Sequence, residues 1–383
     1  VINLALLGVF KYSGFFMENV NAVFGLEVEV KKLPLPIGIS FYTFQSISYL
    51  VDIYRRVCPP QKSLIKMGLF ISFFPQLIAG PILKYYDIAA QIDNRKVSLP
   101  LFNQGAVRFL QGLAKKIIIA NIMAKTADEI FALGINDIST PMAWIGIVAY
   151  TFQIYFDFSG YSDMAIGLGK MFGFHINENF NYPYIATSIK DFWRRWHISL
   201  STWFKEYLYI PLGGNREGKF KTYRNLMIVF FMTGLWHGAS WNFVVWGLFH
   251  GVFLVLERML PIEKFLRFRL IQNIYALLVV MVGWVFFRAE NLTAALDYLK
   301  RMFVPYKTDV YSAYLSNEFM MVAALGLVSC GFLTLIFDKL PVKTEYKFGF
   351  LRLVNPAWCA VIAYFSVLLL ASNTYNPFIY FRF

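Results

Sequence analysis

The sequence predicts an all-α polytopic membrane protein, and three observations support this fold class. Of the 383 residues, 58% are hydrophobic and 19% aromatic, whereas only 15% are charged, which is unlike an ordinary soluble domain. Apolar runs close to the ~20 residues that cross a bilayer recur along the chain. These runs are continuous and do not alternate apolar with polar residues, so they predict helices rather than barrel strands.

No soluble domain or linker rich in Gly or Ser separates the apolar runs, so residues 1–383 are predicted to form a single membrane-embedded domain. The chain opens at Val1 inside the run "VINLALLGVF", and we expect that it lacks the first amino-terminal spans. The clearest of these apolar runs are Met142–Ile154, Leu226–Leu256, Leu270–Phe287, Phe319–Phe337 and Trp358–Ala371.

Two apolar segments are poor candidates for regular spans. Leu33–Leu50, "LPLPIGISFYTFQSISYL", and Phe74–Leu83, "FPQLIAGPIL", place Pro, Gly, Gln and Ser at membrane depth. Broken backbone at that depth is tolerated only where it is buried in protein or lines a cavity. The two segments therefore predict re-entrant pieces around an interior space, with ordinary proline-kinked helices as the alternative.

The net charge of +13 is better explained by membrane topology than by nucleic-acid binding, because the cations are spread over short loops without a nucleic-acid motif. Loops Arg258–Arg269 and Lys339–Arg352 each carry a net charge of +3, whereas Arg288–Glu318 is neutral. Loop Arg55–Lys66 carries only basic charges. The positive-inside rule places the basic loops in the cytoplasm and Arg288–Glu318 outside.

Disulfide, metal and nucleotide chemistry are not predicted. Cys58, Cys330 and Cys359 form no CxxC pair, and two of them lie in apolar runs. His237 and His250 lie 13 residues apart, which is roughly 20 Å along a straight helix, too far to share a metal ion. No nucleophile elbow, phosphate loop or dinucleotide fingerprint is present, so we expect neither a metal nor a bound cofactor.

The stretch "DFWRRWHISLSTWF" concentrates polar chemistry in this apolar chain. At helical spacing its residues form an aromatic-aliphatic stripe and, beside it, a cationic stripe with one imidazole. The second stripe predicts a helix that lines a polar cavity, whereas the alternative is an interfacial helix among lipid head groups. The first stripe comprises Ile189, Trp193, Trp196, Leu200, Phe204 and Tyr207, and the second Lys190, Arg194, His197, Ser201 and Lys205.

His237 lies near the middle of 32 residues that contain no Asp, Glu, Lys or Arg, between Arg224 and Glu257. This stretch is too long for one upright span of ~20 residues. Because Gly234 and Gly238 flank the histidine, a break is expected there that exposes His237 to a cavity. An ionisable group at membrane depth predicts function, with a neutral core histidine as the alternative.

Asp157 and Asp163, in "FDFSGYSDMAIGLGKMFGF", also border an apolar run. Taken alone, they would indicate an ion or proton pathway.

Three motifs in this order resemble the membrane-bound O-acyltransferases: "FDFSGYSDMAIG", "NYPYIATSIKDFWRRWHISLSTWFKEYLYIPLGGNR" and "GLWHGASWNFVVWGLFHG". The resemblance extends over nearly the whole chain from "LPIGISFYTFQ" onward. It is closest to the bacterial branch that includes the alginate O-acetylation membrane protein. The "YIPLGGNR" turn, Tyr209 to Arg216, favours that branch over teichoic acid D-alanyl transferases.

This resemblance implies a helical bundle with re-entrant segments around a central funnel. It implies that His237 is the catalytic histidine and His197 the second functional histidine. His237 is the candidate general base, because imidazole accepts a proton near neutral pH. His197, with Arg194 beside it, is expected to orient the donor or stabilise negative charge on the reacting oxygen. The residues expected to bind substrate are Arg194, Trp193, Ser201, Asn242, Trp236 and Asp191.

The expected activity is O-acyl transfer, most simply O-acetyl transfer, in a bacterial cytoplasmic membrane. The expected donor is acetyl-CoA or another acyl thioester from the cytoplasm. The expected acceptor is an exported polysaccharide or an extracytoplasmic acetyl-esterase-like partner protein, with membrane lipid around the chain and no nucleic acid. The alternatives are D-alanyl or other acyl transfer to a wall polymer, a transporter or channel with a histidine proton relay, and a catalytically idle scaffold of a secretion complex.

Overall fold

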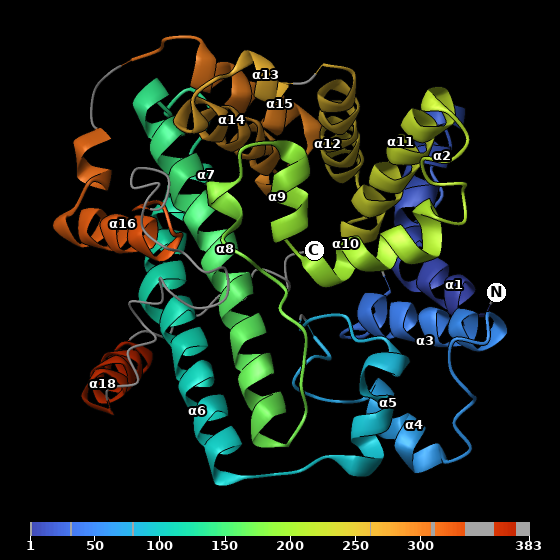
Figure 1. The fold of residues 1–383 in the computed structure, drawn as a ribbon. Coiled ribbons are helices and arrows are strands. Elements are labelled where there is room, and N and C mark those ends of the chain that lie inside the picture. Colours follow the sequence, from blue (N-terminus) through green and yellow to red (C-terminus); the bar gives the residue numbers. More distant parts are fainter. Residues whose placement is uncertain are drawn as a thin grey trace.

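A computed structural model describes residues 2–30, 33–78, 80–260, 262–307, 311–333 and 356–372. These residues form helices and connecting segments, with no strand among them (Figure 1). The all-α prediction is therefore confirmed for the described part of the chain.

The helices follow one another in three groups. The first comprises α1 (Ile2–Leu7), η1 (Gly8–Tyr12), α2 (Ser13–Phe24), α3 (Ile39–Tyr54), α4 (Leu64–Ile71) and α5 (Tyr85–Asn94). The second comprises α6 (Leu99–Ala114), η2 (Lys115–Ala120), α7 (Asn121–Phe131), α8 (Thr140–Met171), η3 (Pro183–Ile185), α9 (Ile189–Arg195), α10 (Ile198–Phe204) and η4 (Lys205–Tyr209). The third comprises α11 (Lys219–His237), α12 (Trp241–Met259), α13 (Ile262–Phe265), α14 (Arg269–Arg288), α15 (Leu292–Phe303), η5 (Tyr311–Tyr314), α16 (Asn317–Ser329) and α18 (Pro356–Ser372).

The predicted apolar runs coincide with helices to different degrees. Leu270–Phe287 matches α14 almost residue for residue, and Trp358–Ala371 lies within α18. Met142–Ile154 is the first half of α8, whose Ser139 caps the backbone N–H of Met142. By length and apolar composition, α12 and α14 are long enough to cross a membrane, and α16 and α18 are shorter apolar helices.

The remaining two apolar runs each differ from a single helix. Leu226–Leu256 divides between α11 and α12, as its length and the glycines beside His237 predict. Phe319–Phe337 is helical as far as Ser329, and residues 334–337 lie outside the described part of the chain.

Two pairs of glycines bring the backbones of α6 and α8 into contact, and the two helices lie side by side (Figure 1). A Cβ atom on Gly112 would lie 2.5 Å from the carbonyl oxygen of Gly160, and one on Gly105 would lie 2.5 Å from that of Gly167. Only glycine permits so close an approach, as in other membrane helix pairs.

Ion pairs join the same two helices. Lys116 of η2 pairs with Asp157 of α8, and Lys115 Nζ lies 2.7 Å from Asp163 Oδ2. Arg108 of α6 donates from Nε to Asp163 Oδ1 at 2.9 Å. A buried carboxylate needs such cationic partners, so these two aspartates link helices rather than stand as unpaired charges. This pairing weakens the interpretation of Asp157 and Asp163 as an ion pathway.

Three described segments are single π-helical turns: η1, η2 and η4. Such turns are rare and occur often at functional sites. Here each π turn carries polar side chains that reach distant helices, as Lys115 and Lys116 of η2 do.

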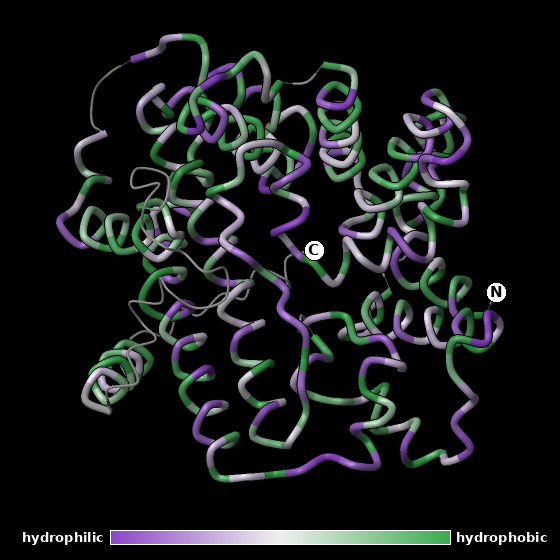
Figure 2. Tube along the Cα trace, viewed as in Figure 1, coloured by the Kyte–Doolittle hydropathy of each residue, from purple (hydrophilic) through white to green (hydrophobic). Residues whose placement is uncertain are grey.

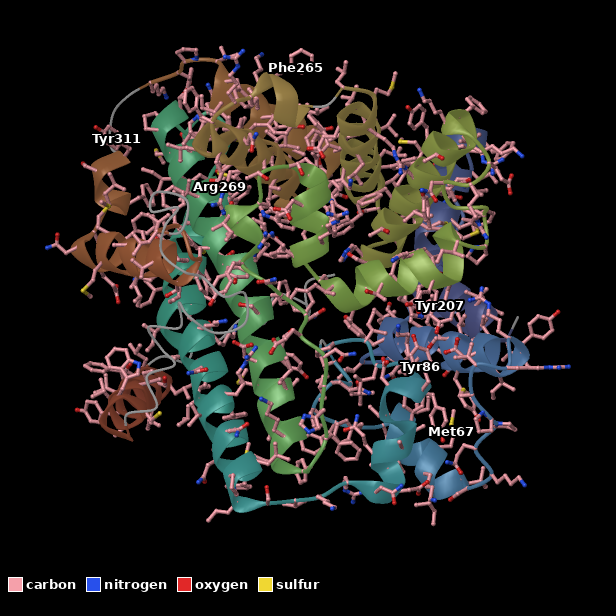
Figure 3. All side chains as sticks on the ribbon, in the orientation of Figure 1. Met67, Tyr86, Tyr207, Phe265, Arg269 and Tyr311 are labelled. Atoms are coloured by element: carbon pink, nitrogen blue, oxygen red, sulfur yellow. The ribbon has the colours of Figure 1, made fainter. Side chains whose placement is uncertain are left out.

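Two loops that were predicted to be cytoplasmic meet at η4. Arg55 Nη1 donates to the carbonyl oxygen of Glu206 at 3.1 Å, and Arg258 Nη1 donates to the Tyr209 hydroxyl at 3.5 Å. Figure 3 labels Tyr207 of η4 and Tyr86 of α5 close together, and the Tyr86 hydroxyl donates to Glu206 Oε2 at 3.1 Å. Arg55 and Arg258, the first residues of the two loops, therefore both contact η4, and the side of the membrane on which the loops lie stays a prediction.

Candidate active site

The uncharged stretch around His237 folds as a helical hairpin. Helix α11 ends at His237, Gly238 is extended with φ −161°, and α12 begins at Trp241. A Cβ atom on Gly247 would lie 2.2 Å from the carbonyl oxygen of Phe230, so the two helices also pack backbone against backbone. The predicted break beside His237 is confirmed, and it sits at the tip of this hairpin.

A pocket of about 180 Å³ lies against His237. Both broken segments contribute to its wall, and they touch each other, because a Cβ atom on Gly38 would lie 2.7 Å from the carbonyl oxygen of Leu77. Both segments therefore line this pocket, whereas their re-entrant character stays a prediction. The lining residues are Lys11, Leu35, Pro36, Ile37, Gly38, Ile39, Ser40, Phe41, Ile78, Trp236 and His237.

Lys11 holds the end of α11 in place. Its ammonium group donates to the carbonyl oxygens of Trp236 and His237 and to Ser40 Oγ, the last two at 3.2 Å. The Tyr12 hydroxyl donates to the carbonyl oxygen of Leu235 at 2.7 Å. The last carbonyls of a helix lack partners within the helix, and a cation there is favoured by the helix dipole. Lys11 and Tyr12 therefore stabilise the helix end that carries His237.

No local signal marks Lys11 as a functional residue, because it lies 225 residues before Trp236 in an apolar amino-terminal run. Only the folded chain brings it to the pocket.

The His237 ring is enclosed by aromatic side chains. Its centroid lies 4.8 Å from Trp236, 5.0 Å from Trp246 and 5.1 Å from Phe287. The residue is 8% exposed, so it reaches the pocket while the protein covers most of its surface. A group in such an enclosure reacts with little competition from bulk water.

The predicted continuous helix through "DFWRRWHISLSTWF" is wrong. The chain forms two short helices, α9 and α10, and breaks at Trp196 and His197, where His197 has a φ of 45°. His197 is completely buried, whereas Arg194 is exposed, as are Lys190 and Lys205. The cationic stripe therefore does not continue through His197, because the break turns the imidazole away from the exposed cations.

The two predicted catalytic histidines nevertheless lie close together. The His197 ring lies 6.1 Å from Trp236, which also contacts His237, and the two imidazoles are near enough to interact electrostatically. The ring of Phe158 packs edge-on against His197 at 4.7 Å. His197 is therefore a buried neighbour of the His237 pocket, on the other side of Trp236.

Asn242 has a structural role that argues against its prediction as a substrate ligand. Its amide donates to the carbonyl oxygens of Phe286 at 3.2 Å and Ala289 at 2.8 Å, and its Oδ1 accepts from Ser240 Oγ. Both amide protons are therefore used at the end of α14. Asn242 therefore joins the start of α12 to the end of α14.

The other predicted ligands fall into two groups. Trp236 lines the pocket with His237. Asp191 accepts from Arg195 Nε at 3.0 Å at the start of α9, and Trp193 packs against Trp246 at 5.8 Å. Ser201 is half-buried in α10. The substrate-binding roles of Arg194, Trp193, Ser201 and Asp191 stay predictions, and the structure does not bring these residues to the pocket wall.

His250 is completely buried one turn beyond Trp246, whose ring lies 5.3 Å from it. Because the chain turns after His237, the straight-helix separation expected between His237 and His250 does not apply. Within the described ranges, no three His, Cys, Asp or Glu side chains form a group that could hold a metal ion.

Comparisons with known proteins agree with the motifs. The profile of the membrane-bound O-acyltransferase family matches residues 59–293. The chain is 44% identical to a probable alginate O-acetylase of Pseudomonas putida, covering 100% of this chain and 83% of that protein. It is 52% identical to the corresponding protein of Azotobacter vinelandii, over 79% of this chain and 61% of that protein. It is 42% identical to a peptidoglycan O-acetyltransferase of Helicobacter pylori, over 79% of this chain and 63% of that protein.

The chain thus spans less than two thirds of the length of the last two relatives.

Proposed function

This chain belongs to the membrane-bound O-acyltransferase family, a family of acyltransferases, and from this premise we propose that it transfers an acetyl group from a thioester to a hydroxyl group of a cell-surface polysaccharide. The observation that carries the proposal is His237, placed at a helix break and facing a pocket that the broken segments enclose. The named relatives act on alginate and on peptidoglycan, which supports a polysaccharide as the acceptor class.

The proposed reaction requires one proton to be moved. The hydroxyl oxygen attacks the thioester carbonyl carbon while His237 accepts the hydroxyl proton. The carbon–sulfur bond then breaks, and the imidazolium returns the proton to the leaving thiolate. Base catalysis of this kind contributes typically ~10²–10⁴-fold, so positioning in an enclosed site must supply much of the remaining acceleration.

The size of the pocket favours a small acyl group. Its volume of about 180 Å³ lies below the ~300–1,000 Å³ typical of sites for drug-sized ligands. An acetyl thioester terminus and one hydroxyl group fit this space better than a long acyl chain. This observation supports acetyl transfer over transfer of a fatty acyl group.

We further propose that the chain is a multi-pass protein of a bacterial cytoplasmic membrane, with a funnel that admits the donor from the cytoplasm. The acceptor, either the polysaccharide itself or an extracytoplasmic acetyl-esterase-like partner protein, reaches His237 from the other side. The physical reason is that charged carriers do not cross hydrocarbon unaided. Because the donor and the acceptor reach the same histidine from opposite faces of the membrane, the acetyl group crosses the membrane while the donor and the acceptor each stay on their own side.

Labelling of single cysteines tests this topology. Cysteines introduced into Arg288–Glu318 should react with a membrane-impermeant thiol reagent on intact cells, whereas those in Arg258–Arg269 should react only after permeabilisation. The two loops lie at opposite ends of α14, which makes them a matched pair. Lys339–Arg352, also predicted to be cytoplasmic, lies outside the described residues and provides a third position. Labelling of either basic loop from outside would overturn the arrangement.

Acyl transfer by the purified protein tests the proposed activity. The protein in liposomes should move label from acetyl-CoA, supplied on one side, to a hydroxyl-bearing oligosaccharide or partner protein on the other. The rival interpretation, a transporter with a histidine proton relay, predicts proton-driven flux in the same liposomes and no labelled ester. Liposomes without protein give the background hydrolysis of the donor.

A further inference from the structure

Asn179 lies in the segment that follows α8, which Figure 2 shows largely in hydrophilic colours where it runs back beside that helix. The residue is completely buried. Its Nδ2 donates to Ser162 Oγ of α8 at 3.3 Å. A buried amide in a largely apolar protein must satisfy its hydrogen bonds within the protein, so its partners show what it does.

The oxygen of this amide can be identified from its neighbours. It accepts from the backbone N–H of Ser199 at 3.1 Å and from the Ser199 hydroxyl at 2.8 Å. Since a backbone N–H can only donate, the atom that faces it is the amide oxygen and not the amide nitrogen.

The same oxygen lies 3.2 Å from Nδ1 of His197. An amide oxygen only accepts, so Nδ1 must carry its proton in this contact. The Ser199 hydroxyl, 3.5 Å from Nδ1, gives its one proton to Asn179 and also presents a lone pair to the ring. A neutral imidazole has one N–H, and therefore Nε2 of His197 carries the lone pair.

Asn179 also holds the backbone at the helix break. Its carbonyl oxygen accepts from the backbone N–H of Ile198 at 2.9 Å, directly after the left-handed conformation of His197. That conformation is uncommon for a residue other than glycine and persists only where its surroundings fix it. One residue thus fixes both the direction and the protonation pattern of the imidazole.

We propose that Asn179 is a positioning residue that fixes His197 as the Nδ1–H tautomer, so that His197 acts as a hydrogen-bond acceptor at Nε2 during acyl transfer. This inference rests on the proposed function for its activity readout. It differs from the expectation that His197 stabilises negative charge on the reacting oxygen, because an Nε2 that carries a lone pair cannot donate a hydrogen bond to that oxygen.

The tautomer can be measured directly on the full chain. Solid-state NMR of the protein with isotope-labelled histidine, reconstituted in bilayers, distinguishes a protonated Nδ1 from a protonated Nε2. The His197 signal is assigned by its loss in His197→Gln. We expect the Nδ1–H form at neutral pH, and a wild-type Nε2–H form would overturn the inference without any variant of Asn179.

Two substitutions of Asn179 separate positioning from simple folding. Asn179→Leu removes the acceptor and should lower kcat about 10²-fold with little change in KM, because the imidazole is released while the substrate pocket is unchanged. Asn179→Asp keeps an acceptor for Nδ1 and for Ser199 and should recover most of the activity. Asn94→Leu, at an exposed position, controls for the substitution itself.

The outcomes distinguish this inference from the proposed function. If Asn179→Leu keeps wild-type kcat and the Nδ1–H signal while His237→Ala is inactive, the role of Asn179 is wrong and the function stands. If His237→Ala retains full acyl transfer, the proposed function itself fails, and the NMR measurement still decides the tautomer.

Discussion

Replacing His237 with alanine is expected to abolish acyl transfer while the protein still inserts and folds. The imidazole is the titratable side chain of the hairpin tip that lines the pocket, and its loss removes the proposed acceptor for the hydroxyl proton. A general base contributes ~10²–10⁴-fold, so kcat should fall by at least 10²-fold. The N–H···O contacts of Lys11 with this helix end involve backbone carbonyls, and alanine preserves them.

His175→Ala is the matched control, because His175 is exposed and lies away from the pocket. Both variants should elute as the wild-type protein does in size-exclusion chromatography. Transfer of labelled acetyl in liposomes gives the rate, and ester content of the polymer in a complemented deletion strain gives the result in cells. Wild-type ester levels with His237→Ala would rule out His237 as the base.

Gly112→Ala is expected to disrupt the packing of α6 against α8. The new Cβ atom would lie 2.5 Å from the carbonyl oxygen of Gly160 and 2.7 Å from the backbone nitrogen of Met164. Both neighbours are backbone atoms, so no side chain can rotate away, and the helices must separate. Overpacking in a well-packed core costs on the order of 1–3 kcal/mol, and separation would also strain the nearby ion pairs of Lys115 and Lys116.

Gly68→Ala is the matched control, since Gly68 is also helical but a Cβ atom there would meet nothing within 4 Å. In helices, alanine is favoured over glycine by about 1 kcal/mol, so this control should be neutral or slightly stabilising. Gly112→Ala is therefore expected to lower stability, whereas Gly68→Ala should leave stability unchanged or raise it slightly. The half-life of monodisperse protein on heating in detergent measures the effect, and equal half-lives would show that the α6–α8 crossing can relax.

The sequence alone predicted the helical class and several helix positions because apolar runs directly report burial in lipid or protein. Leu270–Phe287 was correct within one residue at each end, since charged residues border that run. The division of Leu226–Leu256 follows from its length and from the glycines beside His237, which interrupt the helix there. Length and composition do not encode which helices cross, and the glycine pairs of α6 and α8 were not recognised.

The candidate site was predicted in part. His237 and its break carry a local signal, an imidazole between two glycines within an uncharged stretch. The break at His197 carries none, because aromatic residues keep their helical spacing through it and the left-handed residue is not glycine. Lys11 contacts His237 from 226 residues away in the sequence, and Asn179 contacts His197 from 18 residues away. Their roles therefore depend on the tertiary fold.

The π turns restrict how the chain can change in length. Each contains more backbone per turn than an α-helix, and η2 uses this to direct Lys115 and Lys116 at Asp163 and Asp157. Deleting one residue from Lys115–Ala120 would restore regular α-helix and leave the helix that follows close to its present orientation, because the π turn accommodates one more residue than an α-helical turn. The deletion would instead change the directions of Lys115 and Lys116, so the π turn matters for these two ion pairs more than for the course of the helix.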